Sequence, residues 1–223
     1  MDKKMMEGKS RCIIVASGTC EISLLKFIKP DDYVIAADGG YKYLKDADIR
    51  PDIIIGDFDS LSKEDLEMIK MQAKCTFIQL PCEKDDTDTL YCIKHAIEKG
   101  YGEIHLFGVI GDRPDHSYAN IQCLSFMKDK GVSGVIHDTE YDILMLQDES
   151  ITLDKEYGDE MSIFSFSGKC DNVSLKGFKY PLTDETLTSS FPVGISNVIT
   201  QDEAEITVGN GKAIIFIKRR FSY

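Results

Sequence analysis

Residues 51–60 have the sequence PDIIIGDFDS, a proline-led run of isoleucines that ends in a glycine and two aspartates. A short, continuous apolar run of this kind is typical of a strand that is buried on both faces of a sheet. Residues 32–40, DYVIAADGG, have the same form, with an apolar run followed by an aspartate and two glycines. We therefore expect two buried strands, over 52–55 and 32–37, each followed by a polar turn.

The first two thirds of the chain alternate such apolar runs with amphipathic stretches in which apolar residues recur at helical spacing. This alternation predicts an α/β domain over residues 1–145, with a mostly parallel, Rossmann-like sheet and helices on both faces. In such a sheet, ligands bind at the carboxyl ends of the strands. The other expected strands are 11–16, 75–80, 103–107 and 132–137, and the expected helices are 21–28, 41–47, 63–73, 87–99 and 116–130.

After about Tyr141 the helical periodicity fades, and short β-type runs separated by Gly, Asn and Asp replace it. They predict a small C-terminal all-β sandwich domain over residues 146–223. Gly209-Asn210-Gly211 is a hairpin signal between the last two runs. Sheet edges in so small a domain are often covered by oligomerisation. The expected strands are 142–146, 150–153, 161–166, 170–175, 204–208 and 212–217.

The composition of the chain argues against nucleic-acid binding, membrane insertion and secretion. The net charge of −12 argues against binding a nucleic-acid backbone, which rewards clustered Lys and Arg. No apolar run reaches the ~20 residues of a membrane helix, and the polar N-terminus lacks the apolar core of a signal peptide. The seven cysteines form no CxxC pair, which favours reduced thiols. We expect a soluble, cytoplasmic protein.

Aspartates follow four of the expected strands, at the sheet edge where ligands bind. Carboxylates that converge repel one another, and a hard cation such as Mg²⁺ or Ca²⁺ relieves the repulsion. Asp57 and Asp59, two apart in an extended segment, would place both carboxylates on one side and turn Phe58 into the core. Any single Asp is equally explained as a turn former or, as for Asp86, a helix cap. The set is Asp38, Asp57, Asp59, Asp85, Asp86, Asp88, Asp112 and Asp115.

Two basic residues, Lys84 and Arg113, are embedded among these aspartates. They either bind phosphate oxygens or form an ion pair with a neighbouring Asp. Gly39 and Gly40 permit a close backbone approach to a ligand. His116 either helps to position that ligand or has a structural role at a helix N-terminus. Because neither GxGxxG nor a P-loop motif is present, the pattern predicts a metal and phosphate site of another kind.

The order of these motifs resembles that of thiamine pyrophosphokinases over almost the whole chain. GDFDS followed by the DDTD and RPDH segments is a specific combination, well beyond an isolated DxD. A segment of the β part, GISN, resembles the family's C-terminal thiamine-binding motif. The matching segments are Asp38-Gly39-Gly40, Pro51-Asp52, Gly56 to Ser60, Lys84 to Asp88, Gly108 to His116, Ala119-Asn120 and Gly194 to Asn197.

The resemblance implies an enzyme that transfers the pyrophosphoryl group of ATP, with Mg²⁺, to the hydroxyl of thiamine. It also implies an α/β domain that holds ATP, a β-sandwich that holds thiamine, and a homodimer with active sites at its interface. By matching position, Asp57, Asp59 and Asp88 would ligate Mg²⁺, and with Lys84 and Arg113 they form the expected catalytic set. ATP would meet Asp38, Gly39, Gly40, Lys84, Arg113, Asp115 and His116, and thiamine would meet Ser196 and Asn197.

Two features depart from the pattern of that family. Relatives usually have two adjacent glycines where this chain has Gly111-Asp112, which together with Pro114 leaves the loop less backbone freedom. The chain has no Trp and offers Val198 and Ile199 where some relatives stack thiamine on a Trp. Three other functions fit the same residues: a pyrophosphokinase for a pterin-like alcohol, a metal-dependent phosphohydrolase, and a non-catalytic thiamine or nucleotide sensor.

Overall fold

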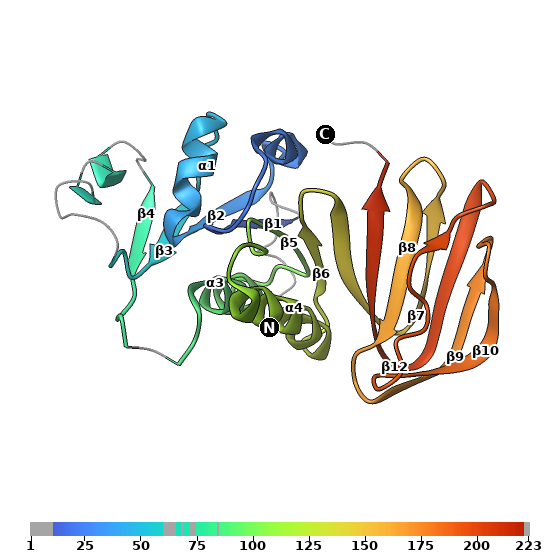
Figure 1. Ribbon diagram of the computed structural model, residues 1–223. Coiled ribbons are helices and arrows are strands. Elements are labelled where there is room, and N and C mark those ends of the chain that lie inside the picture. Colours follow the sequence, from blue (N-terminus) through green and yellow to red (C-terminus); the bar gives the residue numbers. More distant parts are fainter. Residues whose placement is uncertain (1–10, 60–65, 68, 72–74, 84, 221–223) are drawn as a thin grey trace. The chain divides into compact units, whose positions relative to one another are not determined.

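The computed structural model describes residues 11–59, 66–67, 69–71, 75–83 and 85–220. They form two compact units, which divide between Thr139 and Glu140. The boundary expected from the sequence, between residues 145 and 146, falls inside strand β7, Tyr141–Asp154. The mixed α/β class is confirmed (Figure 1). Within the described part of the chain, no helix has the length and apolarity needed to cross a membrane.

The first unit is built on a parallel sheet with the strand order β6-β5-β1-β2-β3-β4. Its central strands are apolar throughout because both faces of the sheet are covered. The expected strand ends are confirmed to within one residue. The strands are β1 Cys12–Val15, β2 Tyr33–Ala37, β3 Ile53–Gly56, β4 Thr76–Gln79, β5 Glu103–Phe107 and β6 Ser133–His137.

Helices cover the two faces of this sheet (Figure 1). Ile13 and Val34 pack in one core cluster with residues of α1, whereas Ile14 and Ile35 on the other face are fully buried where α3 packs against β1 and β2. Thr87 caps α3 by accepting a hydrogen bond from the N–H three residues ahead, at 3.1 Å. The expected helix at 63–73 lies largely outside the described residues. The described helices are the 3₁₀ turns η1 Ile22–Phe27 and η2 Asp38–Gly40, and α1 Tyr41–Asp46, α3 Asp88–Glu98 and α4 Pro114–Asp129.

The second unit is an antiparallel β structure with its own apolar core. Two expected pairs of strands are wrong, because 142–146 and 150–153 belong to one strand, β7, and 204–208 and 212–217 belong to one strand, β12. The sequence gives no signal for β10, since its residues LTDETLT are mostly polar and exposed. The strands after β7 are β8 Gly158–Ser165, β9 Lys169–Lys176, β10 Leu182–Thr188, β11 Asn197–Val198 and β12 Glu203–Arg219.

The segment Gly209-Asn210-Gly211 is a bulge in β12, and the expected hairpin turn is wrong. The pairing register shifts between Val208 and Lys212, so that three residues of β12 face Asp148 of β7. Gly211 has a φ of 96°, and its N–H donates to Asp148 Oδ1 at 3.1 Å. Before the bulge β12 also pairs with β9, and after it with β8. The glycines therefore let β12 bend at the bulge, so that it pairs with β9 on one side of the bulge and with β8 on the other.

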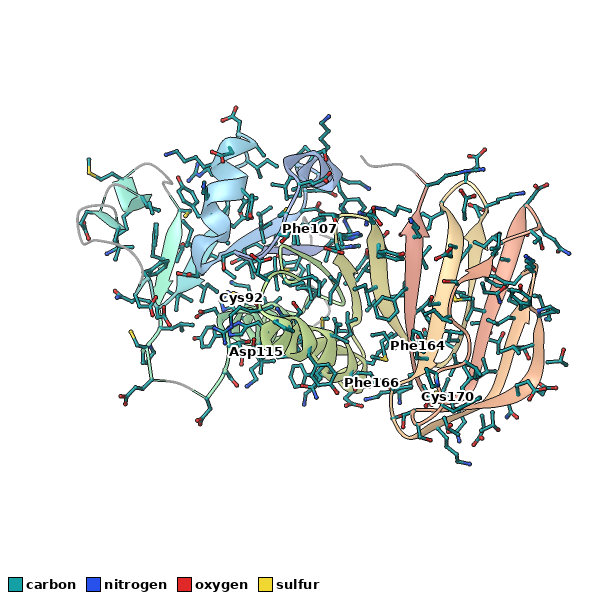
Figure 2. The ribbon with its side chains drawn as sticks, viewed as in Figure 1. Cys92, Phe107, Asp115, Phe164, Phe166 and Cys170 are labelled. Carbon is teal, nitrogen blue, oxygen red and sulfur yellow. The ribbon has the colours of Figure 1, made fainter. Side chains whose placement is uncertain are left out.

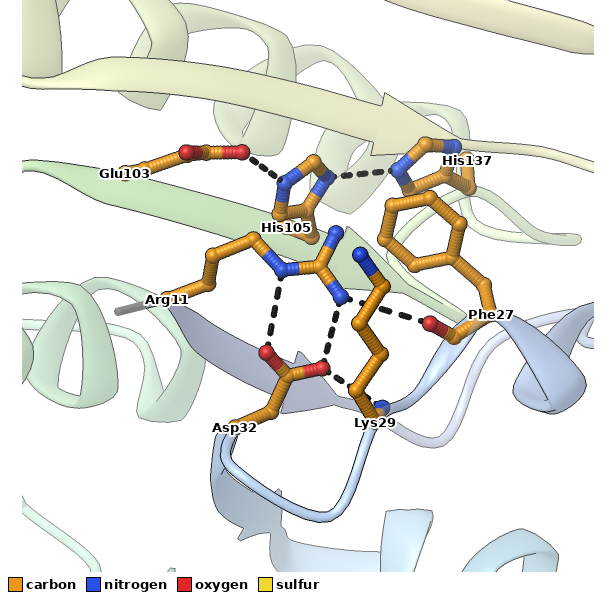
Figure 3. A network of polar contacts seen from close by, with 7 residues as sticks. All are labelled: Arg11, Phe27, Lys29, Asp32, Glu103, His105 and His137. Atoms are coloured by element: carbon orange, nitrogen blue, oxygen red, sulfur yellow. Dashed lines mark hydrogen bonds and ion pairs between the residues drawn. The ribbon is translucent and has the colours of Figure 1, made fainter. Parts of the chain in front are cut away.

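A buried polar network joins strands of the first unit (Figure 3). Arg11 donates to both carboxylate oxygens of Asp32, at 2.9 and 2.7 Å. His105 Nδ1 lies 2.8 Å from His137 Nε2, and His105 Nε2 lies 2.7 Å from Glu103 Oε1. Removing one partner of a buried ion pair typically costs about 3–5 kcal/mol. The Arg11–Asp32 pair therefore ties the start of β1 to the loop before β2, and the contact between the histidines ties β5 to β6.

Candidate nucleotide and metal site

The strand order reverses between β1 and β5, because the chain builds β2 to β4 on one side of β1 and β5 and β6 on the other. Parallel α/β sheets bind ligands at such a switch point. A pocket of about 430 Å³ lies at the carboxyl ends of these two strands. Its wall comes from the loops after β1 and β5 and from three helices, and it includes Ser17, Thr19, Tyr43, Thr89, Arg113 and His116.

Backbone hydrogen bonds hold the two loops of this pocket together. Gly18 N–H donates to Gly108 O at 2.7 Å, and Thr19 N–H donates to Ile110 O at 2.8 Å. A Cβ on Gly18 would lie 2.6 Å from Gly108 O, so only glycine permits this approach. Gly108 has a φ of 62°, which glycine also adopts readily. The part of the pocket wall that these two loops form is therefore backbone held in close contact.

Side chains of α4 secure the loop after β5 from the other side. Asn120 donates from Nδ2 to Val109 O at 2.7 Å and is itself buried. Ser117 Oγ accepts a hydrogen bond from Gly111 N–H at 3.1 Å. Pro114 occupies the first turn of α4, where its fixed φ and missing N–H are tolerated. The fixed φ of Pro114 is thus accommodated by the helix start.

Four of the expected carboxylates lie within electrostatic range at the ends of β2 and β3 and the start of α3. Burial raises the pKa of Asp38, and the charges of Asp88, Asp57 and Asp59 raise it further, against a backbone hydrogen bond that lowers it. Asp38 has a φ of 47°, a left-handed conformation that Asp adopts more easily than most residues. Its Cα packs against Gly56, where a Cβ would lie only 2.9 Å away. The strand-end rule thus brings these carboxylates within electrostatic range of one another.

The segment 57–59 is a turn, and the extended conformation expected there is wrong. Phe58 has a φ of 57°, and Asp57 Oδ1 accepts a hydrogen bond from Asp59 N–H at 3.3 Å. The burial expected for Phe58 is confirmed, and its ring lies 6.3 Å from that of Phe77 between centroids. A bulky residue in this backbone region is strained by roughly 1–3 kcal/mol. The buried ring offsets that strain and anchors the turn between the two carboxylates.

The four carboxylates Asp38, Asp57, Asp59 and Asp88 suit a hard cation, although their side chains are not gathered around one point. Among the residues that the structure describes, no three Asp, Glu, His or Cys side chains form a ready-made metal-binding group. Burial is the main cause of the raised pKa of Asp38, and the nearby charges of Asp88, Asp57 and Asp59 add to it, a repulsion that a divalent cation would relieve. Carboxylate oxygens favour Mg²⁺ over softer metals. The residues therefore fit Mg²⁺ by their chemistry.

Arg113 is paired with Asp115 at the start of α4, where Asp115 is labelled in Figure 2. The N–O distance is 2.6 Å, and both side chains are about two-thirds exposed, at 68% and 64%. The guanidinium lowers the pKa of Asp115 to about 2. Of the two roles considered for this arginine, pairing with a neighbouring Asp is the one seen here. Arg113 and His116 both line the pocket, so the ion pair between Arg113 and Asp115 lies at the edge of the pocket.

Other expected site residues lie around the pocket or outside the description. Lys84 lies outside the described residues. Gly39 and Gly40 form η2, and a Cβ on Gly40 would lie 1.9 Å from a backbone oxygen of β1, so this glycine is required for packing. Asp86 does not cap α3; it forms an ion pair with Lys94 at 2.6 Å.

In the second unit, Asn197 is buried and its amide holds the backbone of Tyr180. Its Oδ1 accepts from Tyr180 N–H at 3.0 Å, and its Nδ2 donates to Tyr180 O at 2.8 Å. Asn197 also lines a pocket of about 190 Å³ with apolar side chains of β9, β10 and the segment before β11. Ser196 is exposed, with a φ of 54°, and its hydroxyl donates to Glu160 Oε1 at 3.3 Å. Asn197 thus shapes this pocket by fixing the backbone.

Two family models match the chain in order. The model described as "Thiamin pyrophosphokinase, catalytic domain" matches residues 24–136, and that described as "Thiamin pyrophosphokinase, vitamin B1 binding domain" matches residues 148–215. The chain belongs to the thiamin pyrophosphokinase family. The thiamine pyrophosphokinase of Bacillus subtilis (strain 168) is 30% identical to it over 182 residues, which cover 81% of this chain and 85% of that protein.

Solved structures of the thiamin pyrophosphokinase family share the fold. A structure of thiamine pyrophosphokinase from Bacillus subtilis has a TM-score of 0.87 and 28% identity, and it covers 95% of this chain and 100% of its own. A structure of thiamin pyrophosphokinase from Geobacillus thermodenitrificans has a TM-score of 0.83 and 27% identity, with 95% and 99% covered. The mixed α/β architecture described above is therefore that of known thiamin pyrophosphokinases.

Sequence reasoning missed much of the pocket in this thiamin pyrophosphokinase family member. It left residues 17–19 between an expected strand and an expected helix, and it placed Tyr43 and Thr89 only in helices. The sequence did contain one signal, the glycine in the turn directly after the first strand, because doubly wound folds commonly bind a ligand at that turn. Using it required the strand order, which puts β5 beside β1.

Proposed function

We propose that this chain transfers the pyrophosphoryl group of ATP to the hydroxyl of thiamine, giving thiamine diphosphate and AMP. The observation that carries the proposal is the 430 Å³ pocket at the switch point, whose lining residue Thr89 directly follows Asp88 of the carboxylate group. The two family models, matched in order along the chain, support the same assignment.

The proposed step is an in-line attack of the thiamine hydroxyl on the β-phosphorus of ATP. A bond forms between the hydroxyl oxygen and the β-phosphorus. The bond from the β-phosphorus to the oxygen that bridges it to the α-phosphate breaks, and AMP leaves with that oxygen. The hydroxyl proton passes to a carboxylate of the site or to water. Such a transfer depends mainly on alignment and on neutralising charge.

Asp57, Asp59 and Asp88 would hold Mg²⁺, which when bound neutralises and orients the phosphates. Arg113 would exchange Asp115 for a phosphate oxygen, at little cost because water already screens that exposed pair. Lys84 would meet the phosphates in the same way. Together these three carboxylates and two basic residues form the proposed catalytic set. The ATP contacts proposed are Asp38, Gly39, Gly40, Lys84, Arg113, Asp115 and His116.

For the second unit we propose a β-sandwich that binds thiamine and forms a homodimer. Ser196 and Asn197 would face thiamine, whose cationic ring suits a chain of net charge −12. Residues 180–198 include a set of exposed apolar side chains, and interfaces commonly bury such groups. These side chains are between 37% and 66% exposed and are Tyr180, Phe191, Val193, Ile195 and Val198.

The first unit, proposed as Rossmann-like, would bind ATP, and the active sites would lie at the dimer interface. We also propose a cytoplasmic location. All seven cysteines are free thiols, which supports a reducing compartment.

An acceptor panel tests this function against its alternatives. Purified protein is supplied with ATP, Mg²⁺ and either thiamine, a pterin-like alcohol or no acceptor, and AMP and phosphate are measured. We expect AMP only with thiamine. AMP formed with the pterin-like alcohol would indicate another pyrophosphokinase, and phosphate released without an acceptor would indicate a hydrolase. Thiamine binding without AMP would indicate a sensor.

A further inference from the structure

Tyr43 links helix α1 to the loop after β1. Its hydroxyl donates a hydrogen bond to Gly18 O at 2.8 Å, from 25 residues away in sequence. The N–H of the same peptide group, which belongs to Thr19, donates to Ile110 O at 2.8 Å. One peptide group of the pocket wall is therefore held from both sides, by α1 and by the loop after β5.

This peptide group lies where two parts of the site meet. Gly18, Thr19 and Tyr43 all line the pocket. Helix α1 begins directly after the Asp38-Gly39-Gly40 turn, which carries one of the clustered carboxylates. That turn also packs on the loop after β1, since a Cβ on its middle glycine would lie 3.1 Å from the Cβ of Ser17. Tyr43 thus connects the helix that follows the carboxylate turn to the backbone of the pocket wall.

We propose that Tyr43 is a positioning residue for the nucleotide, because its hydroxyl orients the Gly18–Thr19 peptide group that faces the bound ATP. This rests on the proposed function, which takes ATP as the occupant of the pocket. Hydrogen bonds at both ends of one peptide group strengthen each other, so losing one weakens the other. The ring of Tyr43 fills its place on the pocket wall whether or not the hydroxyl is present.

Tyr43→Phe tests the hydroxyl alone, because it keeps the ring. One hydrogen bond of this kind corresponds to roughly a three- to tenfold change in an equilibrium constant, so the KM for ATP should rise by about that factor. The kcat at saturating ATP and the KM for thiamine should change less than about twofold, because the variant alters nucleotide binding and leaves the reacting groups in place.

Tyr41→Phe is the matched control. It makes the same chemical change two residues earlier in α1, at a buried side chain that does not line the pocket. We expect its KM for ATP to equal that of the unaltered protein. An equal rise in both variants would overturn the proposal, because a loosened α1 would then explain the effect.

Arg113→Ala separates failure of this proposal from failure of the proposed function. If it raises the KM for ATP and Tyr43→Phe does not, the pocket holds ATP and the role of Tyr43 is refuted. If neither variant changes that KM, the placement of ATP fails and the role of Tyr43 fails with it. A lowered kcat with an unchanged KM for ATP in Tyr43→Phe also refutes positioning, because a purely structural defect has that signature.

Discussion

Replacing Gly18 by Ala tests whether the pocket depends on the close contact of its two loops. The new Cβ would lie 2.6 Å from Gly108 O and 2.7 Å from Ile110 O. Both atoms are backbone, so neither can rotate away. The loops would have to separate by about 0.8 Å to restore an ordinary contact of 3.4 Å. The two interloop hydrogen bonds, now 2.7 and 2.8 Å, would then exceed the usual range.

The cost of Gly18→Ala follows from this clash. Overpacking typically costs about 1–3 kcal/mol, and each weakened hydrogen bond roughly 0.5–1.5 kcal/mol. The two terms overlap, because stretching the bonds is how the clash is relieved. Alanine also stabilises the fold by about 0.4–1 kcal/mol, because it lowers the conformational entropy of the unfolded chain. We expect a net loss of about 1–3 kcal/mol and an unfolding temperature lowered by about 3–10 °C.

Thermal unfolding and the KM for ATP are the two readouts for Gly18→Ala. We expect the KM for ATP to rise at least about tenfold and the KM for thiamine to change little. Gly102→Ala is the control, because a Cβ there would meet nothing within 4 Å. A Gly18→Ala protein with the unfolding temperature and KM of the Gly102→Ala protein would refute the account of the pocket wall.

Burial raises the pKa of Asp38, so the folded chain binds that proton more tightly and its stability falls as the pH rises above 3.8. Asp38→Asn, which also tolerates a left-handed φ, should therefore raise the unfolding temperature at about pH 7 and not at pH 3. Burial lowers the pKa of His105 despite its hydrogen bond to Glu103, so its neutral form stabilises the fold fully above pH 6.5 and less below it. His105→Gln should flatten the pH dependence of unfolding in that acidic range, and an unchanged profile would contradict the assignment. Asp57→Ala should reduce kcat by orders of magnitude with little change in unfolding temperature, and a substantially active variant would exclude the metal role. Asn197→Ala should destabilise the second unit by about 1–3 kcal/mol in denaturant titrations, because the backbone of Tyr180 loses its partners.

The central strands of the first unit were predictable because they are buried on both faces. A run such as Ile53–Gly56 has no competing local interpretation when it lies between a proline and a polar turn. The carboxylate group followed from the same logic, since parallel strands end at one edge. The conformation of residues 57–59 was not predictable, because a left-handed Phe58 depends on the core that receives its ring.

The second unit was less predictable, because its features depend on partners distant in sequence. Gly209-Asn210-Gly211 has the composition of a hairpin turn, and only the pairing with β7 makes it a bulge. The amide of Asn197 serves Tyr180, which lies 17 residues away. The pocket loop at Ser17 was missed for the same reason, since Ser, Gly and Thr carry no distinctive chemistry until β5 is placed beside β1.

The central claim is pyrophosphoryl transfer from ATP to thiamine, and the stoichiometry of products tests it most directly. Purified protein is incubated with ATP, Mg²⁺ and thiamine, and nucleotides and thiamine phosphates are separated by chromatography. The account predicts AMP and thiamine diphosphate in equal amounts, with both abolished by EDTA. ADP with thiamine monophosphate, or AMP without any thiamine phosphate, would contradict it.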